Sequence, residues 1–288
     1  MTRREQWVSA LERAVRTATV VLPRDVVQAL RGALDRETTE LARLHLETIL
    51  ENERVARENG LPLCQDTGTP VFFVRAGAES PWLADLPDAL SDAVRAATDS
   101  VPLRPSAIHP FTDENVGNVA RGVPVIDWDL VPGRDLEITY VAKGGGSENA
   151  SGLLFVPPGA GSDAVLRAVL THVVRVAPRA CPPIVIGVGI GGTADWALRL
   201  AKRALVRRLD ARHPDPSIAA FEVRLLDAVN RSGIGPAGLG GATTALAVHA
   251  DFAYRHPASL PVGVALQCWA DRRATVRIPE SGIAEVME

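Results

Sequence analysis

The sequence lacks any hydrophobic run long enough to cross a membrane. No uninterrupted apolar stretch approaches the roughly 18 to 20 residues that a transmembrane helix needs. Its first residues, MTRREQWVSALERAV, carry charges where a secretory signal peptide needs an apolar segment. We therefore expect a cytoplasmic protein with no membrane partner.

The sequence also lacks an excess of positive charge. Its 31 Lys and Arg residues stand against 34 Asp and Glu residues, which gives a net charge of −3. A protein that binds nucleic acid normally presents a marked basic surface. We therefore expect no nucleic-acid partner, while a local basic pocket for a small anion remains compatible with this balance.

Cysteine is scarce, with three residues in a chain of 288. An odd, small number without an export signal excludes a disulfide framework. No Cys-x-x-Cys pair is present, so the spacing alone favours buried, inert thiols. A metal or cluster site and a catalytic nucleophile are the alternatives.

What the sequence does contain is a helical N-terminal section followed by a mixed region. Apolar residues recur at three-to-four spacing through residues 1–60, which predicts helices there. Neither internal repeats nor a low-complexity linker interrupts the chain. We predict a mixed α/β fold in which this largely helical preface packs on a domain with a small mixed sheet and glycine-rich loops. Residues 1–288 would then form a single domain, with the functional site in residues 61–288.

Within the mixed region, short β-branched runs alternate with amphipathic segments. The pattern predicts strands at 71–74, 123–126, 136–141, 153–156, 184–186 and 261–266. It predicts helices at 82–99, 164–176, 196–209 and 217–230.

A glycine-rich segment, Gly187–Gly192, matches the dinucleotide-binding pattern G-x-G-x-x-G between a predicted strand and helix. That pattern also needs an acidic residue about 20 positions later at the end of a strand, whereas Asp210 closes a predicted helix. A tight turn with close packing of strand on helix is the simpler interpretation. Anion binding by backbone N–H groups at the start of the helix is another.

Two further glycine-rich loops are predicted at 143–149 and 232–241. Glycine allows a ligand to approach the backbone closely because it has no Cβ. Three such loops therefore indicate a site that is lined by backbone amides and suits a small anionic ligand.

The surroundings of the cysteines shift the balance away from inert thiols. Each cysteine falls at the end of an apolar run and meets polar, Pro or Gly sequence, so all three could converge at one edge of a sheet. Cys181 is followed by proline, as in some iron–sulfur ligand runs. Three thiolates would leave one iron of a four-iron cluster without a protein ligand, and an open iron is a Lewis acid.

At these positions the sequence resembles a known family. The resemblance is carried by five motifs in family order, namely Leu63–Gly68, Lys143–Asn149, Gly187–Thr193, Ile234–Gly241 and His256–Val262 with Cys268. They look like the class I fumarate hydratases and L-tartrate dehydratases, specifically the α subunit or the N-terminal half of the fused enzymes. The resemblance covers nearly the whole chain.

The resemblance implies an oxygen-sensitive 4Fe-4S cluster held by Cys64, Cys181 and Cys268. In the family, the fourth iron of that cluster binds the carboxylate and the hydroxyl of the substrate. The resemblance further implies that Asp66 takes part in proton transfer and that Gln65 hydrogen-bonds a substrate carboxylate. Both residues directly follow the first cysteine, so their side chains must lie within several ångström of the cluster.

Further residues acquire expected roles in the same way. His256 matches the catalytic histidine of the family, and a neighbouring carboxylate would orient it for acid–base work. Arg104 matches an arginine that grips a substrate carboxylate, a task that suits its planar fork. Gly146, Ser147 and Asn149 would present backbone amides and side chains to the cluster or the substrate.

The resemblance also implies a partner. Fused family members carry a second domain that completes the same site, so we expect a separate β subunit here, in an α2β2 assembly. The expected reaction is reversible loss or addition of water on a small dicarboxylate. Fumarate and L-malate are the leading pair, and L-tartrate or another substituted dicarboxylate is the alternative.

Two hypotheses of other classes compete with this one. The chain could be a cluster-bearing regulatory or assembly subunit without its own chemistry, although Asp66 and His256 are both present. It could instead be a nicotinamide-dependent oxidoreductase that uses Gly187–Gly192.

Overall fold

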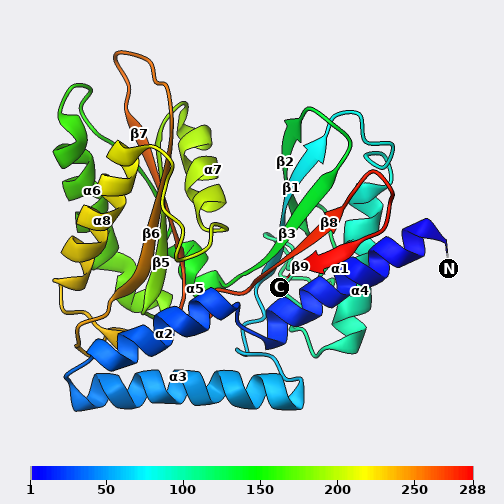
Figure 1. Ribbon diagram of the computed structural model, residues 1–288, viewed down its shortest axis with the longest axis horizontal. Helices are drawn as coiled ribbons and strands as arrows, with labels where there is room; N and C mark the ends of the chain where they lie inside the picture. Colours follow the sequence, from blue (N-terminus) through cyan, green and yellow to red (C-terminus); the bar gives the residue numbers. More distant parts are fainter. Residues whose placement is uncertain (1, 288) are drawn as a thin grey trace. The chain divides into compact units, whose positions relative to one another are not determined.

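The computed structural model describes residues 2–287 and confirms a mixed α/β fold, with two small mixed sheets where the sequence predicted one (Figure 1). Each sheet belongs to its own compact unit. Unit 1 consists of the residues up to Arg24, of Asn52–Gly145 and of the residues from Arg272 onward. Unit 2 consists of Asp25–Glu51 and Gly146–Asp271. The single domain expected from the sequence stays a prediction.

Unit 1 is built around a five-stranded sheet in the order β2-β1-β3-β8-β9. Its strands are β1 (Thr69–Gly77), β2 (Val125–Val131), β3 (Leu136–Lys143), β8 (Arg273–Ile278) and β9 (Glu285–Met287). Only the β1–β2 pair is parallel. The helices α1 (Arg3–Val20) and α4 (Leu86–Ser100) pack together and share one apolar core with β1, β3 and β8.

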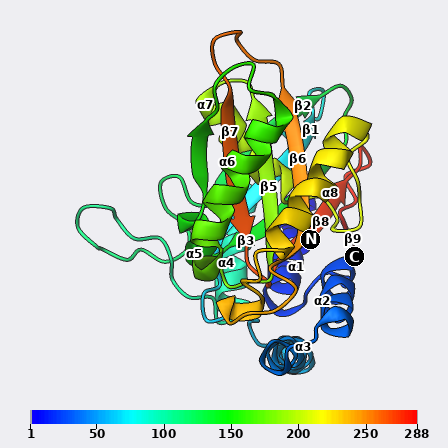
Figure 2. The same ribbon diagram turned by 90° about the vertical axis from the view of Figure 1, so that its left-hand side faces the viewer.

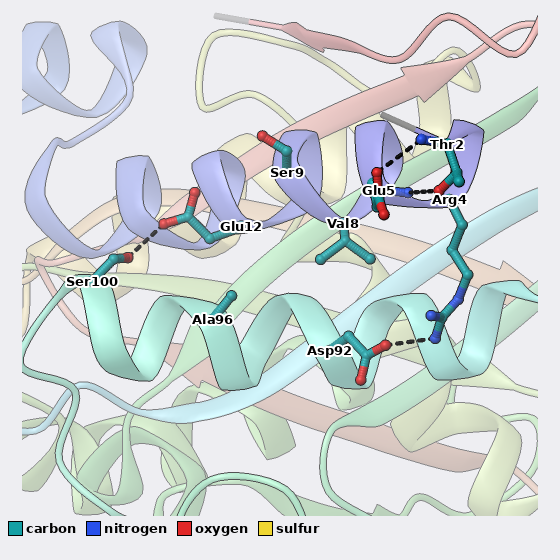
Figure 3. Close-up of a pocket in the computed structure, with 9 residues that line it drawn as sticks. All are labelled: Thr2, Arg4, Glu5, Val8, Ser9, Glu12, Asp92, Ala96 and Ser100. Carbon is teal, nitrogen blue, oxygen red and sulfur yellow. Dashed lines mark hydrogen bonds and ion pairs between the residues drawn. The ribbon is translucent and has the colours of Figure 1, made fainter.

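A shallow groove lies on unit 1 between α1 and α4 (Figure 3). Arg4 forms an ion pair with Asp92 across it, and the Ser100 hydroxyl donates to Glu12 further along. None of the predicted site residues lines this groove. It is therefore not the candidate site.

Unit 2 is built around a four-stranded sheet in the order β4-β7-β5-β6, in which only β5 and β6 are parallel. Its strands are β4 (Gly152–Phe155), β5 (Ile184–Gly191), β6 (Ala245–Ala253) and β7 (Pro261–Gln267). Its helices are α2 (Arg24–Arg36), α3 (Glu40–Asn59), α5 (Gly145–Asn149), α6 (Gly161–Val176), α7 (Ala194–Ala204) and α8 (Pro216–Asn230). Three of them, α2, α3 and α5, also include residues that belong to unit 1.

The helices of unit 2 cover both faces of its sheet. Ile184, Ile186 and Val188 of β5 join the apolar core formed with α6 and α8, which lie in front of the sheet in Figure 2. The intervening residues Gly187 and Gly189 face α7 on the opposite side. Strand residues alternate between faces, so one strand serves both layers.

Most of the glycine run at 187–192 is strand and not the predicted turn. Gly187–Gly191 belongs to β5, and only Gly191 and Gly192 adopt positive φ. A Cβ on Gly187 would lie 2.0 Å from the carbonyl oxygen of Ala201 in α7. These glycines therefore serve close packing of strand on helix, which confirms the packing part of the simpler interpretation but not its turn. The pattern match gives no support to dinucleotide binding.

The predicted helical preface is confirmed as three helices, α1, α2 and α3.

Glu37 connects the loop after α2 to the glycine loop of unit 2. Its Oε2 accepts the Ala242 N–H at 2.8 Å, and its Oε1 accepts the Thr38 N–H at 3.0 Å. Burial tends to raise the pKa of Glu37, but the amide donors outweigh it and hold that pKa below its usual value.

The sequence pattern did not predict three of the strands, namely β6, β8 and β9. The predicted loop at 143–149 also contains a short helix, α5. None of the helices formed by residues 2–287 combines the length and the apolar character that a membrane crossing requires.

Candidate functional site

The loop that joins α3 to β1 in unit 1 carries the first cysteine motif. Cys64 and Asp66 are half-buried in this loop, and Gln65 between them is exposed. The Cys64 thiol lies 3.7 Å from Oε1 of Gln65, within reach of a weak S–H···O hydrogen bond. The thiol is therefore not sealed in an apolar core.

Three hydrogen bonds hold Asp66 in place. Its Oδ1 accepts the N–H of Gly68 at 3.0 Å, and its Oδ2 accepts the N–H of Gly145 at 2.8 Å. Its backbone carbonyl accepts a hydrogen bond from Nη1 of Arg272 at 2.7 Å. The carboxylate is thereby fixed in one orientation, while each oxygen keeps a further lone pair for a proton or a ligand.

Arg104 lies beside this loop. Its backbone N–H donates to the buried Thr67 hydroxyl at 3.0 Å, and its side chain is exposed. Unit 1 therefore brings together four of the predicted residues, namely Cys64, Gln65, Asp66 and Arg104. A thiol, an amide and a fixed carboxylate therefore share this loop, and the backbone of Arg104 adjoins it.

The segments that carry the other two cysteines lie side by side in unit 2. Cys181 ends the 3₁₀ helix Ala177–Ala180, is exposed, and has a left-handed backbone with φ of 52°. Its carbonyl accepts the N–H of Trp269 at 3.2 Å, which places it next to the segment of Cys268. Cys268 directly follows β7 and is half-buried.

Helix α5 lies against the same two segments. The buried Ser147 hydroxyl is 3.5 Å from Oε1 of Gln267, the residue before Cys268. A Cβ on Gly146 would lie 3.1 Å from the Arg179 carbonyl, close to Cys181. The predicted residues Gly146 and Ser147 therefore adjoin the two cysteines, and Asn149 at the end of the helix is exposed.

His256 lies elsewhere in unit 2. It is exposed in the loop between β6 and β7, where its Nδ1 accepts the N–H of Ala258 at 3.1 Å. Figure 1 shows this loop at one end of β7, and Cys268 directly follows the last residue of the strand at the other end. A strand of seven residues spans roughly 20 Å at about 3.3 Å per residue. Unit 2 therefore does not bring His256 next to Cys181 or Cys268.

The cysteines fit an iron–sulfur cluster by their chemistry. None of the three is in a disulfide, none is fully buried, and each lies in a loop or at the end of an element. Thiolates are the ligands that such clusters use. Within residues 2–287 no group of three or more His, Cys, Asp or Glu side chains is gathered as a metal site, and the cysteines are divided between the two units.

Two residues that adjoin the site were missed by the sequence analysis. Thr67 anchors the Arg104 backbone, and Arg272 binds the Asp66 carbonyl. The sequence did place three charged residues between two apolar runs, which indicates that some of them are buried with polar partners: Asp271, Arg272 and Arg273. Nothing in the local sequence connects them to Asp66.

Comparison with known proteins agrees with the resemblance. The family model described as fumarate hydratase (Fumerase) matches residues 8–277. A putative L(+)-tartrate dehydratase subunit alpha from Methanocaldococcus jannaschii is 45% identical over 268 residues, covering 91% of this chain and 94% of that protein. L(+)-tartrate dehydratase subunit alpha from Escherichia coli strain UTI89 is 37% identical over 281 residues, covering 96% and 93%. The chain therefore belongs to the fumarate hydratase (Fumerase) family, a family of hydro-lyases.

Proposed function

We propose that this chain is the α subunit of an iron–sulfur hydro-lyase that reversibly removes water from a small hydroxydicarboxylate. The observation that carries the proposal is the loop of unit 1, where Cys64, Gln65, Asp66 and Arg104 lie together in a member of a hydratase family. Elimination of water next to a carboxylate needs a base, a carboxylate clamp and an electrophile. Asp66 of this loop would be the base, and Arg104, whose backbone adjoins the loop, would be the clamp.

We assign the cluster ligands to Cys64, Cys181 and Cys268. When bound, the cluster would supply a Lewis-acidic iron that polarises the substrate's carboxylate and departing hydroxyl. The assignment rests on the family and on the accessibility of all three thiols.

The protein's own groups then have distinct tasks. The exposed guanidinium of Arg104 binds one substrate carboxylate through two parallel hydrogen bonds. The amide of Gln65 donates to a carboxylate oxygen. Asp66 takes the proton from the carbon that loses it and returns it in the reverse direction. The predicted contacts of Gly146, Ser147 and Asn149 with the cluster or substrate belong to the same proposal, and the catalytic role of His256 stays a prediction.

L(+)-tartrate is the first substrate to test. The relatives that match over most of their length are named as L(+)-tartrate dehydratase subunits alpha, which favours tartrate over the fumarate/L-malate pair. The name of the family model supports fumarate/L-malate as the second candidate. L(+)-tartrate carries one hydroxyl more than L-malate. An active site discriminates between the two compounds through the polar groups that hydrogen-bond to that hydroxyl.

We expect activity only together with a partner chain. The relatives are named as subunits alpha, which supports a β subunit here. We propose that the two chains form an α2β2 assembly in the cytoplasm. The test is anaerobic coexpression with a candidate β chain, followed by assays for oxaloacetate from L(+)-tartrate and for dehydration of L-malate. We expect kcat/KM to favour L(+)-tartrate by at least about 100-fold. Full turnover by this chain alone, or no dehydration of either compound by the pair, would contradict the proposal.

Replacing Cys64, Cys181 or Cys268 singly with serine should lower the iron and sulfide content several-fold after anaerobic reconstitution, because serine offers no soft thiolate. Thr98→Ser in α4 is the matched control, since Thr98 lies outside the cysteine segments of unit 1. Unchanged iron content in Cys64→Ser would remove the cluster assignment.

A further inference from the structure

Arg272 is one of the largest fully buried side chains, with 1% of its surface exposed. It lies immediately before β8, and its carbonyl accepts the N–H of Ala142 at 3.1 Å, which extends the ladder between β3 and β8. Arginine is almost never fully buried unless a carboxylate or another anion pairs with it. The surroundings of this guanidinium therefore need an explanation.

Among residues 2–287, no carboxylate forms an ion pair with Arg272, although the neighbouring Asp271 is also buried. Nη1 of Arg272 donates to the neutral backbone carbonyl of Asp66 at 2.7 Å, and Nε is buried without a hydrogen-bond partner. The nearby phenol of Tyr140 supplies no negative charge, because burial raises its pKa to about 12 even though the Arg272 charge acts to lower it.

The place of Arg272 in the chain indicates what could compensate its charge. It is the fourth residue after Cys268 along the chain, and the carbonyl that it holds belongs to the second residue after Cys64. Three thiolates with a four-iron core carry a net negative charge. An iron–sulfur cluster on these cysteines would bring the missing anion to this part of the chain.

We propose that Arg272 is a positioning residue that holds the Cys64–Asp66 segment through the Asp66 carbonyl and acts as the counter-charge of the thiolate-ligated cluster. This inference rests on the proposed function, because it requires the cluster. It assigns Arg272 no contact with substrate. Its two parts are separable, since the carbonyl contact needs the geometry of the guanidinium and the counter-charge needs only a cation.

The test compares Arg272→Gln and Arg272→Lys with Arg277→Gln. Arg277 lies on β8, the strand that Arg272 immediately precedes, but its side chain is exposed and pairs with Asp135 at the protein surface. The readouts are iron and sulfide per chain after anaerobic reconstitution, the rate of iron loss to a chelator, the visible spectrum of the cluster, and the melting temperature of the metal-free chain.

We expect Arg272→Gln to lose iron about 10- to 100-fold faster than the wild type, as is typical for groups that support metal ligands. The metal-free chain should melt at the same temperature or higher, because the variant removes a buried charge without a counter-ion. Arg272→Lys should retain iron within a few-fold of the wild type, since it keeps the charge. Arg277→Gln should behave like the wild type.

Several results would overturn the inference. One is wild-type iron retention in Arg272→Gln, and another is iron loss in Arg272→Lys equal to that in Arg272→Gln. A metal-free Arg272→Gln chain that melts well below the wild type would assign the arginine a purely structural role. If Arg272→Gln does not fold, iron retention in Arg272→Lys decides. A wild-type chain that binds no cluster would instead refute the proposed function.

Discussion

Replacing Asp66 with asparagine is expected to lower kcat about 10²- to 10⁴-fold in the coexpressed pair, the usual contribution of a positioned acid–base group. Asparagine has nearly the same shape but cannot take up a proton from carbon. It also presents an NH₂ group to one of the two amides that now donate to the carboxylate, from Gly68 and Gly145. That mismatch should cost about 1–3 kcal/mol of local stability.

Two measurements separate chemistry from structure in this variant. Iron content per chain should stay close to that of the wild type, while turnover collapses. Asp99→Asn in α4 is the matched control, because it makes the same chemical change at an exposed position of unit 1. A loss of kcat that merely follows a loss of iron would make Asp66 a support of the cluster loop and not an acid–base group.

Gly189→Ala is expected to destabilise unit 2 by about 3 kcal/mol, at the upper end of the range for overpacked cores. The new Cβ would lie 2.0 Å from the Ala197 carbonyl oxygen and 2.7 Å from the Ala201 nitrogen, both backbone atoms of α7. Backbone cannot rotate away as a side chain can, so α7 must move off β5. Urea unfolding monitored by hydrogen exchange of β5 and α7 peptides measures the effect.

Gly32→Ala gives the opposite expectation in the same unit. Gly32 lies inside α2, where a Cβ would meet only the mobile end of Arg36 at 3.2 Å, so alanine should stabilise the helix by about 0.5–1 kcal/mol. Equal stability of Gly189→Ala and the wild type would show that α7 does not depend on this close approach.

The helices were predictable because their apolar spacing is a local property. The periodic spacing at 1–60, 164–176 and 217–230 sufficed to find α1, α2, α3, α6 and α8. Strands β6 and β8 were not predicted because both contain charged residues, and β6 also contains a histidine, which normally mark a surface. His249 in β6 is fully buried, and its Nδ1 accepts from Arg207 at 3.1 Å, a partner 42 residues away.

The prediction of a turn at the glycines of β5 was wrong for a related reason. Glycine usually marks a turn, and only the presence of α7 explains why Gly187 and Gly189 stand inside a strand. For the site, the order of Cys64, Gln65 and Asp66 along the chain was enough to place them together. The contacts from Gly145 and Arg272 join residues 79 and 206 positions away from Asp66, which no local pattern encodes.

The division of the chain between its two units also constrains the order in which it can fold during synthesis. The chain passes from one unit to the other after Arg24, Glu51, Gly145 and Asp271. Strand β3 must pair with β8, for example Thr139 with Thr275, so its partner leaves the ribosome only after all of unit 2 has been made. Until then β3 has an open hydrogen-bonding edge that can pair wrongly. Nascent chains halted at Asp271 should therefore need a chaperone, although most of their helices are already complete.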